Sequence, residues 1–159
     1  MFHLGAVQHM ISVSPTEDYE VLREILFHPQ VFHFRSVPDS IKPEEYHFPD
    51  GLYLLAQDGF KPVGYFYFSP QNPILYQVHT AFLPSAWGHQ TVMAARAGIA
   101  WLSLHTECEV LLALVPSFNK SALSFLERLG AQYHGIVPRA VRKEGVRVPE
   151  MIYTLEVTL

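Results

Sequence analysis

The N-terminal part of the chain contains a run whose apolar residues recur every three or four positions, the spacing of a helix. Residues 14–26, SPTEDYEVLREIL, begin with Ser14 and Pro15, and Glu17 follows the serine by three positions. Serine is a good N-cap, proline suits the first helical position, and a glutamate at this distance completes a capping box. The pattern therefore predicts a helix over 14–26 that begins with Ser14 as its N-cap.

Two later runs have the same helical spacing. Residues 87–105, WGHQTVMAARAGIAWLSLH, place apolar side chains along one side of a helix. Residues 119–130, NKSALSFLERLG, begin with Asn119, a good cap, and end with Gly130, a common helix stop. A short helix is also predicted near 43–46, inside a loop that is rich in proline, aspartate and serine.

Strand patterns fill most of the remaining chain. Asp58 and Gly59 give a turn signal between two strands, and the apolar run at 109–118 is typical of a central strand buried on both faces. Cys108 lies beside that run, and we interpret it as a buried, inert side chain. The predicted strands are 2–13, two within 52–70, 74–83, 109–118 and a closing hairpin of 131–141 with 148–157.

The order of these elements indicates an α/β domain with a mixed sheet. The strand at 74–83, the helix at 87–105 and the strand at 109–118 form a β–α–β unit. The two strands of such a unit are expected to be parallel neighbours with a right-handed connection. No internal repeat, low-complexity segment or domain boundary interrupts the pattern, so we expect a single domain over residues 1–159.

Composition and charge narrow the class of protein. Hydrophobic residues make up 49% of the chain and charged residues 16%, which is typical of a packed globular protein. The net charge is −4 and the 11 lysines and arginines are scattered, so we expect no nucleic-acid partner. One cysteine excludes an internal disulfide. The sequence shows neither a signal peptide nor a membrane span, so we expect a soluble cytoplasmic protein.

Several well-known site patterns are missing from the sequence. His28 and His33 are five residues apart, and no histidine pair has the spacing of a zinc site. With one cysteine, we therefore expect no metal. The phosphate-binding pattern G-x-x-x-x-G-K-[ST] and the nucleophile pattern G-x-S-x-G are also missing. The chain is thus neither a P-loop nucleotide hydrolase nor an α/β-hydrolase.

Two segments resemble those of a known superfamily. FLPSAWGHQTV, 82–92, resembles a strand end followed by proline and a pyrophosphate loop, and VPSFNKSALSFLERLGAQYHG, 115–135, resembles a strand, an Asn-x-x-Ala helix and a glycine. With the element order, these segments resemble the GNAT superfamily of acyl-CoA-dependent N-acyltransferases. The resemblance implies a mostly antiparallel sheet of about seven strands, three to four helices and a splayed parallel strand pair.

The resemblance also implies where acetyl-CoA would lie. The strand matching 74–83 would separate from its parallel neighbour, and the backbone of Phe82 and Leu83 would hydrogen-bond the pantetheine arm. Asn119 would hold the pantetheine or order its helix. The helix N-terminus would bind the pyrophosphate, because unpaired N–H groups and the helix dipole favour an anion there. The residues implied at this turn are Trp87, Gly88, His89, Gln90 and Thr91.

The turn departs from the family pattern Q/R-x-x-G-x-G/A. Its defining positions read Trp87, Gln90 and Val92, and Gly88 lies between the first two. Since glycine lets a phosphate approach the backbone, Gln90 and Val92 are expected to crowd it. The Gln90 amide or the His89 ring would then replace the missing donor. Loops of this kind resemble those of bacteriophage and prophage proteins, which implies a divergent member in a host cytoplasm or a virion.

Acyl transfer to an amine needs a proton acceptor and a thioester held beside the amine. His79 is the candidate base, because histidine titrates near neutral pH and the family often has Glu or His on this strand. Tyr133 is the candidate acid, because Leu126 occupies the position of the family's tyrosine. Both residues have a plainer interpretation as packing or surface side chains.

Two functions follow from the resemblance. The first is an N-acetyltransferase that uses acetyl-CoA and an amine acceptor, for which Asp39, Glu44 and Glu45 would suit a cationic amine. The second is a GNAT-like protein that has lost catalysis and serves as a binding or phage assembly protein. A homodimer or a phage-protein partner is a further expectation.

Overall fold

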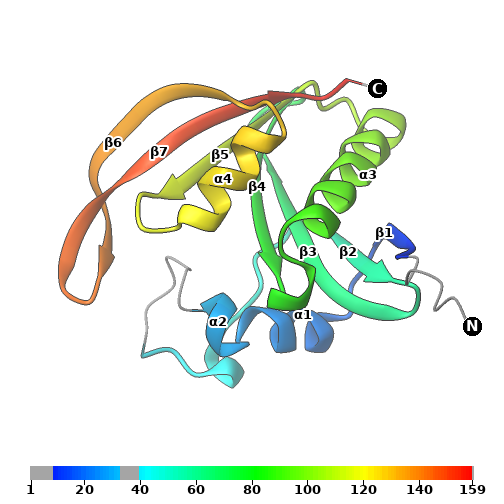
Figure 1. The fold of residues 1–159 in the computed structure, drawn as a ribbon, viewed down its shortest axis with the longest axis horizontal. Coiled ribbons are helices and arrows are strands. Elements are labelled where there is room, and N and C mark those ends of the chain that lie inside the picture. The colour runs from blue at the N-terminus through cyan, green and yellow to red at the C-terminus, as the bar shows by residue number, and fades with distance from the viewer. Residues whose placement is uncertain (1–8, 33–39, 159) are drawn as a thin grey trace, which may run out of the picture.

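A single mixed sheet forms the centre of the protein in a computed structural model that describes residues 9–32 and 40–158. Within those residues seven strands pair in the order β1-β2-β3-β4-β5-β7-β6 (Figure 1). Only β4 and β5 are parallel, and every other neighbouring pair is antiparallel. The strands are β1 Ile11–Pro15, β2 Leu52–Asp58, β3 Lys61–Pro70, β4 Leu75–Phe82, β5 Val110–Pro116, β6 Gln132–Lys143 and β7 Val146–Glu156.

The helices of the described chain lie on both sides of this sheet. They are α1 Tyr19–Leu26, α2 Pro29–Phe32, α3 His89–His105, α4 Lys120–Arg128 and two 3-10 turns, η1 Pro43–Glu45 and η2 Pro84–Ala86. The predicted mixed α/β fold, the parallel β4–β5 pair and the short helix near 43–46 are therefore confirmed. None of these helices is long and apolar enough to cross a membrane.

The predicted start of the first helix is wrong. Ser14 and Pro15 belong to β1, where Ser14 pairs with Leu55 of β2. The helix begins at Tyr19, and its N-cap is Asp18, whose side chain accepts a hydrogen bond from the N–H of Val21 at 3.3 Å. Sheet pairing thus outweighs the local capping box, since Asp18 supplies an equivalent cap four residues later. The predicted first strand extends back to residue 2, and its part before residue 9 lies outside the described residues.

The start and end of α4 agree with the prediction. Asn119 is the N-cap, and its side-chain oxygen accepts a hydrogen bond from the N–H of Ala122 at 3.2 Å. Gly130 follows the helix with φ +77°, a left-handed conformation that favours glycine. These two signals are local, so the neighbouring strands do not override them.

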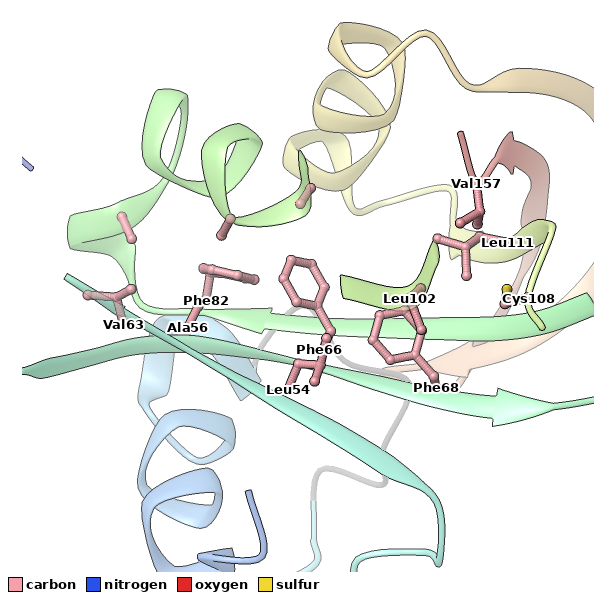
Figure 2. Packing of buried hydrophobic residues seen from close by; sticks show 13 residues of the cluster. Leu54, Ala56, Val63, Phe66, Phe68, Phe82, Leu102, Cys108, Leu111 and Val157 are labelled. Atoms are coloured by element: carbon pink, nitrogen blue, oxygen red, sulfur yellow. The ribbon is translucent and has the colours of Figure 1, made fainter. Parts of the chain in front are cut away.

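Two hydrophobic clusters cover opposite faces of the sheet. On one face, residues of β2, β3 and β4 pack beneath α3 and α4, and in Figure 2 Phe66 and Phe82 lie between the strands and the helices above them. On the other face, α1 packs on β2, β3 and β4 through Leu22, Ile25 and Leu26. We call these the α3 face and the α1 face.

Strand β5 is buried on one face only as far as Val115, which differs from the prediction, and its last residue, Pro116, is buried on the other face. Leu111, Ala113 and Val115 are buried on the α3 face, while the residues between them are partly exposed. The reason is that α1 packs on β3 and β4 and does not cover β5. Cys108, just before this strand, is buried as predicted, with 4% of its surface exposed.

Candidate functional site

The parallel strands β4 and β5 pair over only part of their length. Leu75, Tyr76 and Gln77 pair with 110–112, and no later pair joins the two strands in the described chain. Each strand continues with its outer neighbour: β4 stays paired with β3 as far as Phe82, and β5 stays paired with β7. The sheet is therefore open between the C-terminal halves of β4 and β5.

A cavity occupies this opening and is lined from both faces of the sheet. Its apolar wall comes from β3, α3 and α4 on the α3 face. Among the described residues, no lysine or arginine lines it. Polar residues from β4, β7 and the start of α4 line the rest: Gln77, His79, Thr80, Asn119, Glu150 and Thr154.

His79, the predicted base, lies at this cavity. Its side chain is exposed, and its ring stacks on that of Tyr67, with ring centroids 5.5 Å apart and an angle of 28° between the planes. Stacking fixes the orientation of the imidazole beside the opening. Tyr133, the predicted acid, is exposed, and its ring lies 5.4 Å from that of Tyr153. Tyr153 lines the cavity and Tyr133 does not.

Glu150 of β7 is a site residue that the sequence reasoning missed. Its carboxylate is partly buried, lines the cavity, and makes no hydrogen bond or ion pair within the described chain. Burial raises the pKa of the Glu150 carboxyl above its usual value. The signal in the sequence is slight: one charged residue interrupts an apolar strand, VPEMIY.

A second cavity adjoins the first at the N-terminus of α3. It is lined by the end of β4, the turn before α3, part of α2 and one side of α4. Thr80, Asn119, Ala122 and Phe125 line both cavities. The two cavities therefore form one path from the sheet opening to the N-terminus of α3.

The turn before α3 leaves the first N–H groups of that helix without a side-chain cap. Gly88 is the N-cap, with φ +93° and ψ −123°, and no side chain accepts from the first turn. The hydroxyl of Thr91 instead donates to the carbonyl of Ala86 at 2.7 Å. Uncapped N–H groups and the positive end of the helix dipole form an anion-binding position.

Arg128, at the end of α4, is a second residue that the sequence reasoning missed. A Cβ built on Gly88 would lie 3.8 Å from the Nη1 of Arg128, so the guanidinium is next to the turn. In the part of the chain that the structure describes, this guanidinium makes no hydrogen bond or ion pair. An arginine in the last turn of a helix normally complements the helix dipole, which hides any second role in the sequence.

Some backbone groups that were predicted to hold pantetheine already have partners. The indole N–H of Trp87 donates to the carbonyl of Phe82 at 2.8 Å, and the N–H of Leu83 donates to Val63 of β3 at 2.8 Å. Backbone groups of successive strand residues turn to opposite neighbours, so those of Thr80 and Phe82 face the opening. Of these two carbonyls, Phe82 is capped by Trp87.

Gln90 and His89 do not line either cavity. The amide nitrogen of Gln90 lies 3.2 Å and 3.3 Å from the two ring nitrogens of His9. His9 in turn lies 2.6 Å from a carboxylate oxygen of Asp58. The side chain of Gln90 therefore points toward the start of β1, and Arg128 is the polar side chain that lies beside the turn.

The comparisons with known proteins concern the fold. No family model matches the chain, and no curated protein sequence matches it. Among solved structures, a spermidine N-acetyltransferase from Vibrio cholerae in complex with CoA and spermine matches with a TM-score of 0.76 and 10% identity, covering 92% of this chain and 95% of that one.

Two further solved structures have a similar fold. A GNAT-family acetyltransferase from Bacillus anthracis matches with a TM-score of 0.71 and 14% identity, over 94% of this chain and 95% of that one. A ribosomal-protein-S5-alanine acetyltransferase from Vibrio fischeri matches with a TM-score of 0.73 and 12% identity, over 94% and 96%. The mixed sheet, its parallel β4–β5 pair and these similarities together identify the fold of this chain as that of the GNAT acetyltransferases.

Proposed function

We propose that the protein is an N-acetyltransferase that transfers the acetyl group of acetyl-CoA to an amine. The observation that carries the proposal is the opening of the β4–β5 pair onto a cavity that continues to the N-terminus of α3. An extended arm with a phosphate at one end and a thioester at the other fits such a path. The similarity to a spermidine N-acetyltransferase whose structure contains CoA supports the same assignment.

In this proposal the pyrophosphate lies at Gly88–Thr91. The first N–H groups of α3 donate to it, and Arg128 supplies the positive charge that Trp87 cannot supply. The pantetheine arm follows the β4 wall past Thr80 toward the sheet opening. Asn119 lies where this arm would pass, and its side chain also caps α4.

The chemistry is direct transfer. The amine nitrogen attacks the thioester carbonyl carbon, a C–N bond forms, and the C–S bond breaks with release of the CoA thiolate. His79 accepts the proton of the amine, and Tyr133, the acid predicted from the sequence, does not line the cavity in which the thiolate forms. Holding the two reactants together supplies about 7–11 kcal/mol of the barrier, so few catalytic groups are required.

Arg128→Gln tests the proposed phosphate site. We expect the Kd for CoA to rise about tenfold, because a charge-assisted hydrogen bond to phosphate is lost. The measurement is thermal unfolding with increasing CoA, since a ligand at 100 times its Kd adds about 2.7 kcal/mol of stability. Arg96→Gln is the matched control, because Arg96 is exposed on α3 and lines neither cavity of the path.

Release of thiol from acetyl-CoA in the presence of amines tests the reaction itself. No stabilisation by CoA together with no thiol release would overturn the proposal. Stabilisation by CoA without thiol release from any amine would favour the alternative, a GNAT-like protein that binds CoA and has lost catalysis.

A further inference from the structure

Glu150 lies on the β7 side of the sheet opening, across from β4. On β7 it pairs with Pro116, the last residue of β5, and on the other side with Val137 of β6. The β6 register shifts directly after this pair, between Val137 and Val141. Such irregularities bend a strand and are common next to active sites. Glu150 therefore occupies the position where β5 ends and the β6–β7 hairpin bends.

The side chain of Glu150 faces away from α4. Ala113 and Val115 of β5, with their partners Tyr153 and Met151 on β7, pack toward α4 on the α3 face. Since side chains alternate along a strand, the next pair, Pro116 and Glu150, faces the α1 face.

His79 faces the same side from the opposite wall. Ala81 of β4 belongs to the cluster under α1, and His79 lies two residues before it on the same face. Glu150 and His79 line the same cavity. The α1 face of the opening thus has a carboxylate on one wall and an imidazole on the other.

Glu150 has no partner for its charge in the described chain. Its carboxylate makes no hydrogen bond or ion pair there, and no described lysine or arginine lines the cavity. Burying an unpaired carboxylate is costly, and such residues gather at functional sites. A ligand that brings a cation removes this cost.

We propose that Glu150 binds the ammonium group of the acceptor amine. The acceptor enters the sheet opening from the α1 face and carries no acidic group next to its amine. This inference rests on the proposed N-acetyltransferase function. Glu150 places the amine beside the thioester, and His79 takes its proton before attack. An acceptor with a carboxylate next to the amine is repelled by Glu150, because like charges at close range oppose binding.

The test is steady-state kinetics with acetyl-CoA and three acceptors. Spermidine and alaninamide carry no acidic group, and glutamate carries two. We expect wild-type protein to use spermidine or alaninamide and not glutamate. In Glu150→Gln the KM for the amine should rise tenfold or more, with the KM for acetyl-CoA unchanged, because only the bond to the ammonium is lost.

Two further variants and the Tm of Glu150→Gln separate this role from a structural one. Glu156→Gln, on the same strand and face but outside this cavity, should leave the KM for the amine unchanged. Glu150→Gln should have a Tm at pH 8 no lower than wild type, since burial raises the pKa of Glu150 and the ionised form is disfavoured in the folded state. Glu150→Asp, which keeps the charge, should have an intermediate KM.

The outcomes are distinct. An unchanged KM for the amine in Glu150→Gln, or equal use of glutamate by the wild type, would overturn the inference alone. Stabilisation by CoA without turnover of any of the three acceptors would also overturn it and leave the CoA site intact. No stabilisation by CoA would overturn the proposed function itself.

Discussion

At the scale of a single residue, Gly64 of β3 determines how the Phe82 ring packs beside the sheet opening. It pairs with Phe82 across β3 and β4, and a Cβ built on it would lie 2.3 Å from the Phe82 ring. No such contact is tolerated, so the ring could occupy this place only beside a glycine. Phe82 lines the path to the N-terminus of α3, and Gly64 therefore shapes that path indirectly.

Gly64→Ala should lower the free energy of unfolding by about 1–3 kcal/mol, because the added methyl group forces the Phe82 ring to move. The measurement is equilibrium unfolding in urea. The matched control is Gly98→Ala in α3, where the nearest atom to an added Cβ lies 3.6 Å away, an ordinary contact. That control should be stabilising by about 0.5–1 kcal/mol, as expected for alanine inside a helix. An equal decrease in the free energy of unfolding in the two variants would contradict the role of Gly64.

The residues that the sequence identified correctly are those whose role is local. Asn119 and Gly130 follow from the helix that lies between them. Ser14 carried an equally good local signal and was misassigned, because pairing with β2 decides its conformation. Glu150 and Arg128 gave no usable signal, because each acquires its environment from strands or turns distant in the chain.

At the scale of elements, a group of polar side chains joins the residues just before β1, the end of β2 and the start of α3. Asp58 lies 2.6 Å from His9 and accepts a hydrogen bond from the N–H of Met10 at 3.0 Å. Gln90, in the first turn of α3, reaches the same histidine ring. The edge strand β1 is therefore fastened to the helix whose N-terminus forms the proposed phosphate site.

This group predicts a dependence of stability on pH. The hydrogen bond from His9, and then that from Met10, lowers the pKa of Asp58 below its ordinary value of 3.8. The carboxylate therefore contributes stability that is fully present above that ordinary value and is lost as pH falls through the folded-state pKa. Asp58→Asn should lower Tm at neutral pH, and the curves of Tm against pH for this variant and for the wild type should converge in acid.

Asp50→Asn provides the comparison for that measurement. The Asp50 carboxylate makes no hydrogen bond or ion pair within the described chain, so the Tm of Asp50→Asn should follow that of the wild type at every pH. A constant difference between Asp58→Asn and wild type, down to the lowest pH at which both fold, would contradict the argument.

The pattern of apolar residues predicted most of these elements. The strand and helix order holds over the described chain, because long periodic runs bury a whole face and leave few alternatives. The opening between β4 and β5 has no signature in periodicity. Both 74–83 and 109–118 read as single unbroken strands, and their separation arises from pairing with β3 on one side and β7 on the other.

At the scale of the whole molecule, the proposed substrates reach the opening from different directions. The CoA path runs along α4 to the N-terminus of α3, while His79 and Glu150 lie on the α1 face of the opening. Both substrates can then be bound together, and no acetylated enzyme is required. Cys108, the chain's one thiol, is buried, lines neither cavity, and has a pKa raised chiefly by burial.

This arrangement predicts sequential kinetics. Initial rates at varied acetyl-CoA and amine should give intersecting lines in double-reciprocal plots, because both substrates must be present before the acetyl group moves. Cys108→Ala should retain the wild-type rate of thiol release. Parallel lines, or loss of the rate in Cys108→Ala, would indicate a covalent intermediate instead.

The hydrogen bond between Trp87 and the Phe82 carbonyl has a practical consequence. Trp87 is one of two tryptophans in the chain, and its exposed ring lies on the wall of the proposed CoA path. The fluorescence of an indole depends on its hydration and on the partner of its N–H group. With Trp101 replaced by phenylalanine, light emitted from this one side chain would report when the path fills, and no dye or label needs to be attached to the protein.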